Sequence, residues 1–364
     1  MAKKSNNTIR FTFVGDLIIP KNFITESTTS FGTTGKRLNF GVKAGTNSEF
    51  ASLYGSVRDT IHTIDADGET IDIDWGNRKD PDIIKQVASY RKFRTNIGNE
   101  DGDDTIREFI TEYDFIEYLS EHLRDYKGRV NVGGQYVIRY DNKGILRKNY
   151  NINSVWKARE NEKNFLGLNV HYTYWKDCVD KSDFKENGKI TVNGYVRQYS
   201  SQDKVNKFFP LTVVFDANVF DMNNPKQKAQ YDARMEALDV KNKTPITMFW
   251  SMRVKNGADE VPFDESQLTE FQKRMIAAGD NTLEDFRPRG QIYGDRVSEI
   301  RFYKPLYVNE YSTGSIDTGF TVSEFEDEIA QPIKDETVAD MEKSGETKLP
   351  FEVAGTVDDE PELF

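Results

Sequence analysis

Short apolar runs separated by polar breaks dominate the first third of the chain. Runs rich in Phe, Val, Ile and Thr cover residues 9–20, 37–44, 49–57 and 70–75, and this composition predicts β-strands. A helix is expected over residues 106–123, where apolar side chains recur every three or four positions, with Asp104 or Thr105 as its N-cap. Residues 129–140 and 145–156 flank an Asp-Asn-Lys-Gly turn and predict a long β-hairpin.

The second third repeats this order of elements with different residues. Strands are expected over 166–175, 189–199 and 207–216, followed by a polar helix that contains Tyr231, Met235 and Leu238. A strand over 246–255, a helix over 265–278 and a closing strand over 297–308 complete the pattern. We therefore predict two copies of one architecture, divided at the polar segment 157–163.

A five-stranded barrel with a helix between its third and fourth strands is the oligonucleotide-binding architecture, or OB-fold. We predict a mainly β chain with helical insertions (α+β), built from two tandem OB-fold-like β-barrels over residues 8–157 and 164–312. Residues 315–364, rich in acids, Thr, Ser and Gly, are predicted to form a disordered tail.

Charge is distributed unevenly along the chain. The whole chain has a net charge of -11, but residues 315–364 alone hold 15 acidic residues and 3 Lys. The acidity therefore belongs to the tail, and the rest of the chain is close to neutral. A near-neutral body can carry a basic face, so the net charge does not exclude a nucleic-acid partner.

Few residues suited to catalysis or metal binding are present. The single cysteine, Cys178, cannot form an internal disulfide or a cysteine-based zinc site, which indicates a reducing, cytoplasmic location. Three histidines offer little material for a nucleophile relay or a metal centre. The first residues lack an apolar signal core, and no apolar run is long enough to cross a membrane. We predict no catalytic residue, no cofactor and no metal.

Aromatic and cationic residues recur together on the predicted strands. Cations follow the phosphates of single-stranded nucleic acid, and exposed rings stack on its bases whatever the sequence. Three residues alternate on one strand and are expected to share one face: Tyr195, Arg197 and Tyr199. With these three, the candidate interface for single-stranded DNA or RNA comprises Tyr90, Arg91, Lys92, Arg94, Tyr136, Arg139, Arg147, Lys148, Tyr172, Tyr174, Trp175, Lys176, Trp250, Arg253 and Lys255.

The last seven residues combine acids, a proline and a terminal phenylalanine: Asp358, Asp359, Glu360, Pro361, Glu362, Leu363 and Phe364. They resemble the C-terminal tip of bacterial single-stranded-DNA-binding proteins, although Pro361 stands three residues from the end and Glu362 intervenes. The body is similar in pattern to phage-encoded single-stranded-DNA-binding proteins, in which tandem OB-folds precede an acidic tail. The resemblance implies a non-catalytic protein that coats exposed strands during replication or recombination and recruits other proteins through its tip.

Two other classes of protein remain open from the sequence. A structural or virion protein could use the same β-modules for protein contacts, and it would show no salt-sensitive binding of single strands. A metal-dependent nuclease could use Glu69, Asp72 and Asp74, and it would cleave DNA in the presence of magnesium. Alternating acids on the solvent side of a hairpin explain the same three residues without any metal.

Overall fold

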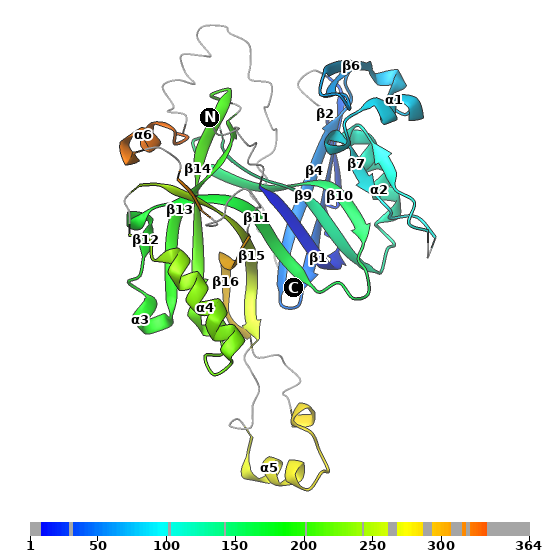
Figure 1. Ribbon diagram of the computed structural model, residues 1–364. Coiled ribbons are helices and arrows are strands. Elements are labelled where there is room, and N and C mark those ends of the chain that lie inside the picture. Colours follow the sequence, from blue (N-terminus) through cyan, green and yellow to red (C-terminus); the bar gives the residue numbers. More distant parts are fainter. Residues whose placement is uncertain are drawn as a thin grey trace.

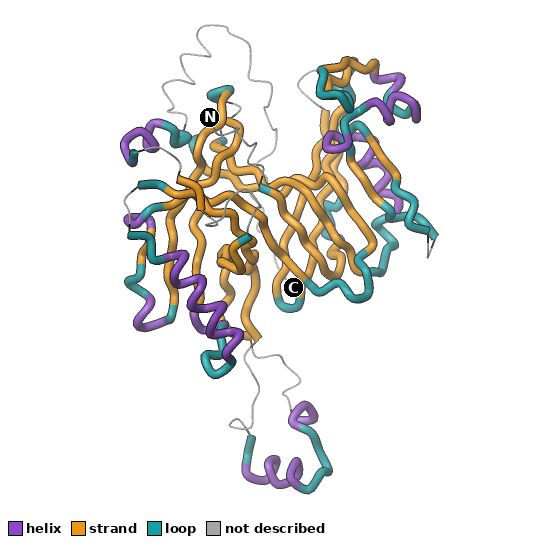
Figure 2. The backbone as a smooth tube through the Cα atoms, in the orientation of Figure 1, coloured by secondary structure: helices purple, strands orange, loops and turns teal. Residues whose placement is uncertain are grey.

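The computed structural model describes residues 9–28, 32–100, 103–141, 143–200, 202–241, 244–260, 268–286, 293–306, 315–317 and 321–332. Within these residues, 15 strands form one mixed sheet and two more form a separate hairpin. Helices are short and lie at the periphery (Figures 1 and 2). The predicted fold class, mainly β with helical insertions, is confirmed.

The first half of the chain forms a closed cycle of strand pairings, called here the N-terminal ring. β1 pairs antiparallel with β3 and with β9, β3 pairs with β4, and β9 pairs with β10. A parallel contact between Asn151 and Ser52 joins β10 to β4 and completes the cycle. The strands of the ring are β1 (Arg10–Ile18), β3 (Thr34–Ala44), β4 (Asn47–Ser56), β9 (Arg129–Tyr140) and β10 (Leu146–Lys157).

The second half repeats these pairings strand for strand and forms the C-terminal ring. β11 pairs with β13 and β15, β13 pairs with β14, β15 pairs with β16, and a parallel contact joins β14 to β16. α4 (Pro225–Leu238) connects the third and fourth strands, as α2 (Glu112–His122) does in the first half. The strands are β11 (Phe165–Tyr174), β13 (Lys189–Ser200), β14 (Val205–Asp216), β15 (Ile246–Glu260) and β16 (Tyr293–Pro305).

The two rings share one sheet and one core. β1 and β11, the first strands of each ring, pair antiparallel from Arg10 opposite Asn169 to Val14 opposite Phe165. A second contact pairs Gly257 of β15 with Asn47 of β4, where a Cβ on the glycine would lie 2.3 Å from the Thr46 carbonyl oxygen. The predicted boundary at 157–163 falls between β10 and β11, but the buried hydrophobic cluster runs through both halves.

Several predicted boundaries are corrected by pairing that the sequence pattern does not reveal. The expected helix start at residue 106 is wrong, because β8 (Arg107–Phe109) pairs with β7 (Phe93–Thr95). α2 begins after Thr111, whose side chain accepts a hydrogen bond from the Asp114 amide. The expected helix over 265–278 is α5 (Glu270–Ala277). Short elements outside the prediction are β2 (Ile24–Thr28), β5 (Thr60–Ile64), α1 (Pro81–Gln86), β12 (Val179–Asp180) and α3 (Phe184–Asn187).

Part of the predicted disordered tail is ordered, which corrects that prediction for residues 315–317 and 321–332. β17 (Ser315–Asp317) pairs with β15, and α6 (Val322–Asp327) lies beside the C-terminal ring (Figure 1). The physical reason is burial, because Phe325 is fully enclosed by other aromatic rings. The C-terminal tip, Asp358 to Phe364, lies outside the described residues.

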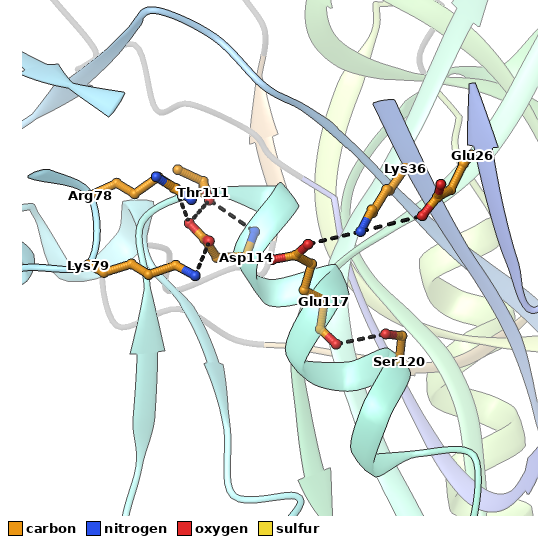
Figure 3. Close-up of polar contacts among 8 residues, drawn as sticks. All are labelled: Glu26, Lys36, Arg78, Lys79, Thr111, Asp114, Glu117 and Ser120. Carbon is orange, nitrogen blue, oxygen red and sulfur yellow. Dashed lines mark hydrogen bonds and ion pairs between the residues drawn. The ribbon is translucent and has the colours of Figure 1, made fainter. Parts of the chain in front are cut away.

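A small insertion between β4 and α2 has its own core. β5 and β6 (Thr70–Asp74) form the separate hairpin, which packs Ile61 and Ile73 against Val87 and Ile110. Asp114 of α2 holds this insertion, as Figure 3 shows: its buried carboxylate accepts hydrogen bonds from Arg78 at 2.9 Å and from the Thr111 hydroxyl at 2.6 Å. Lys79 forms an ion pair with the same carboxylate at 3.2 Å.

We expect Arg78→Ala to destabilise the protein by about 2 kcal/mol, because it removes a charged donor from a buried carboxylate. Lys79→Ala is the matched control. The Lys79 side chain is 64% exposed, and its loss should cost less than about 1 kcal/mol. Denaturant unfolding of both variants measures the difference. Equal losses would show that Arg78 does not anchor the insertion.

Candidate nucleic-acid interface

The outer surface of β3 and β4, called here the first face, carries two exposed aromatic rings. Phe50 is 50% exposed and Tyr54 is 37% exposed. Both lie on β4, four residues apart, so strand geometry places them on the same side of the sheet, about 13 Å apart along the strand. Ala51 and Leu53 between them point into the core.

Two glycines of β3 make room for these rings. Gly41 is the direct partner of Phe50, and a Cβ on it would lie 2.9 Å from the Phe50 ring. A Cβ on Gly35 would lie 2.3 Å from the Tyr54 hydroxyl oxygen. Each ring therefore lies over bare backbone, which fixes its position while leaving much of its surface open to solvent.

Arginines adjoin the first face. Arg37 is the direct partner of Tyr54, with its guanidinium 5.6 Å from the ring centroid. Desolvation lowers the pKa of Arg37, and the positive charge of Arg139 on β9 lowers it further. Arg139 in turn faces Arg147 across the β9–β10 ladder, and of these two like charges only Arg147 is paired with a carboxylate, that of Asp141.

The neighbouring cations differ in how far they are neutralised. Lys36 bonds to Glu117 at 2.9 Å, which raises its pKa, and Arg147 bonds to Asp141 at 2.8 Å. Among the described residues, no ion pair involves Arg37 or Arg139. Arg37 and Arg139 are therefore available to an added anion.

The outer surface of β13 and β14, called here the second face, has the same motif. Arg197 is the direct partner of Phe208 and lies 5.7 Å from its ring centroid, just as Arg37 lies over Tyr54. Tyr195 stacks on Trp175 with centroids 5.6 Å apart and planes inclined by 2°. Tyr199, at the end of β13, is 60% exposed. This face is covered at its centre by Phe325.

Five rings predicted to contact nucleic acid are buried in the core, which corrects that prediction for them: Trp175 is 8% exposed, and the other four are buried more deeply. Tyr136, Tyr172, Tyr174 and Trp250 are at most 2% exposed. The Tyr172 hydroxyl lies 2.8 Å from the Val192 carbonyl oxygen and accepts a hydrogen bond from the Gly194 amide. No base can stack on a ring that has no exposed surface.

The remaining predicted residues are spread over several elements. Lys92 and Arg94 both form ion pairs with Glu108, while Tyr90 is 66% exposed beside Arg91. Arg253 lies between two rings, 4.1 Å from the centroid of Phe165 and 4.3 Å from that of Tyr303. Lys148 and Lys176 are exposed, and Lys255 is half-buried.

No protein-family model and no curated protein matches this chain. Two solved structures of the single-stranded DNA binding protein from Thermus aquaticus are similar to it. A deletion mutant gives a TM-score of 0.32 at 9% identity over 69% of this chain and 88% of that chain. The wild-type protein gives 0.29 at 8% identity over 69% and 87%. Because both TM-scores are below 0.5, function has to be inferred from the residues of this chain.

Sequence reasoning missed the central residues of the first face, Arg37, Phe50 and Tyr54. A signal was present in β4, where Ser48, Ser52 and Ser56 mark the polar side of the strand and the two rings occupy that same side. Large apolar residues at polar-side positions are the unusual feature.

The acidic residues that a metal-dependent nuclease would use lie outside both faces. Glu69, Asp72 and Asp74 are exposed on the β5–β6 hairpin, and Asp72 bonds to His62 at 2.6 Å. In the part of the chain that the structure describes, no three His, Cys, Asp or Glu side chains are grouped to hold a metal ion. None of the described helices has the length and apolar character needed to span a bilayer.

Proposed function

We propose that this protein binds single-stranded DNA with little sequence preference and acts as a coat for exposed strands, without catalysis. The observation that carries the proposal is the first face, where two exposed rings on one strand adjoin Arg37 and Arg139. Bases stack on exposed rings at ~1 to 3 kcal/mol each, and arginines neutralise the adjacent phosphates.

The order of strand pairings supports this proposal. Each ring pairs its five strands in the order first, second, third, fifth, fourth and back to first, with a helix before the fourth strand. This is the order of an OB-fold barrel, whose second and third strands present the surface that binds oligonucleotides. We therefore infer two OB-fold-like units, over residues 8–157 and 164–312. In the first unit, β3 and β4 are the second and third strands.

A role in replication or recombination, with partner proteins recruited through Asp358 to Phe364, stays part of this proposal. Its basis is the sequence of the tip, in which acids and a terminal apolar ring could meet a basic, apolar pocket on a partner. Capture of partners by the full chain, and its loss when Leu363 and Phe364 are removed, would test it.

Binding to labelled poly-dT should weaken as salt rises. The logarithm of the binding constant should fall against the logarithm of the salt concentration with a slope of about -0.7 for each phosphate neutralised, and duplex DNA should bind more weakly. Arg37→Gln and Arg139→Gln should each make the slope shallower by about 0.7. Lys228→Gln on α4 is the matched control and should leave the slope unchanged. Salt-independent affinity, or equal affinity for duplex DNA, would contradict the proposal.

A further inference from the structure

The second face holds a segment of the chain itself. Phe325 of α6 is fully buried there, with its ring centroid 4.4 Å from that of Phe208, 5.3 Å from Tyr195 and 5.4 Å from Trp175. The segment 321–332, called here the Phe325 segment, bonds to β14 through the amide and the carbonyl oxygen of Phe208. Lys207 adds a hydrogen bond to the Asp327 carbonyl oxygen at 2.9 Å.

The covered position corresponds to the open first face. β13 and β14 occupy the places in the C-terminal ring that β3 and β4 occupy in the N-terminal ring. Both pairs of strands place an arginine directly opposite an aromatic ring at nearly equal distance, Arg37 with Tyr54 and Arg197 with Phe208. The same local chemistry is thus exposed on one face and covered on the other.

The covering segment has the chemical character of a nucleotide strand. It presents one aromatic ring, Phe325, flanked by the carboxylates of Glu324, Glu326, Asp327 and Glu328. A base flanked by phosphates likewise offers a flat ring and negative charge. The match is incomplete, because the buried Nε of Arg197 has no hydrogen-bond partner among the described residues. A phosphate oxygen could satisfy this donor.

We propose that the second face is a further binding site for single-stranded nucleic acid and that the Phe325 segment occupies it until a strand displaces it. This inference rests on the proposed function of the first face. A short strand occupies the first face alone, whereas a long strand also displaces the Phe325 segment and occupies the second face. The protein therefore has two footprints on single-stranded DNA.

Phe325→Ala in the full chain tests the proposal, with oligo-dT of two lengths as the probe. When a site is open for only a small fraction of the time, its apparent affinity equals its intrinsic affinity multiplied by that fraction. The variant should therefore bind a long strand about 10- to 100-fold more tightly, with a larger occluded length. The affinity of the first face for a short strand should stay unchanged. Arg197→Gln added to Phe325→Ala should remove the gain.

Hydrogen exchange of the unmodified protein gives a second measurement that does not depend on the variant's stability. Saturating long oligo-dT should accelerate exchange of the amides of Phe325 and Ala330, and duplex DNA should not. Unchanged exchange would overturn the second site alone. The same conclusion would follow if Phe325→Ala did not raise the affinity for a long strand while Phe50→Ala still weakened binding. Absence of single-strand binding by every variant, the wild type included, would overturn the proposed function itself.

Discussion

Replacing Phe50 and Tyr54 together by alanine is expected to lower the affinity for single-stranded DNA at least about 30-fold. Each stacked base contributes ~1 to 3 kcal/mol, so two rings carry about 2 kcal/mol or more. Both rings lie on the outer side of β4, where a strand could reach them without any rearrangement of the core. Fluorescence anisotropy with labelled oligo-dT at constant salt measures the loss.

The same double variant should fold normally. Substitutions of exposed side chains usually change stability by less than about 0.5 kcal/mol, and the glycines beneath the two rings, Gly35 and Gly41, need no side chain to cover them. Phe271→Ala on α5 is the matched control, because its ring is 69% exposed on a different element. Unchanged DNA affinity, or a melting temperature that falls by several degrees, would remove the first face from the interface.

Whether a segment forms a helix or a strand could be predicted from the sequence more reliably than which side of a strand is buried. The major strands of both rings were predicted, because apolar runs and turn residues delimit them. β11 shows the difference. Tyr172 and Tyr174 share the buried side of this strand with Leu168 and Val170. A tyrosine has an apolar ring and a polar hydroxyl, so its residue type fits both a core position and an exposed stacking role.

The first face was missed for a different reason. Its chemistry depends on a cross-strand pair, Arg37 with Tyr54, and cross-strand register is a tertiary property that residue spacing does not reveal. The docking of Phe325 was hidden in the same way. Its acidic surroundings predict disorder, whereas three rings from distant parts of the chain bury it.

Tyr172→Phe is expected to have the opposite effect to the variant of the first face: it should lower stability and leave DNA affinity unchanged. The Tyr172 hydroxyl accepts a hydrogen bond from the Gly194 amide at 2.7 Å and lies 2.7 Å from the Leu211 carbonyl oxygen. Burial raises the pKa of Tyr172 well above its usual value, so the group is a neutral hydroxyl inside the core.

Removing that hydroxyl leaves a buried backbone amide without its partner, at a cost of about 1 to 3 kcal/mol. The melting temperature should therefore fall by about 2 °C or more, since 1 kcal/mol shifts it by about 2 °C in a chain of this size. Tyr54→Phe is the matched control: it deletes a hydroxyl from an exposed ring, so it should leave the melting temperature unchanged and change DNA affinity by less than about twofold. If Tyr172→Phe weakened DNA binding while the melting temperature held, Tyr172 would belong to the interface and the division between core rings and stacking rings would be wrong.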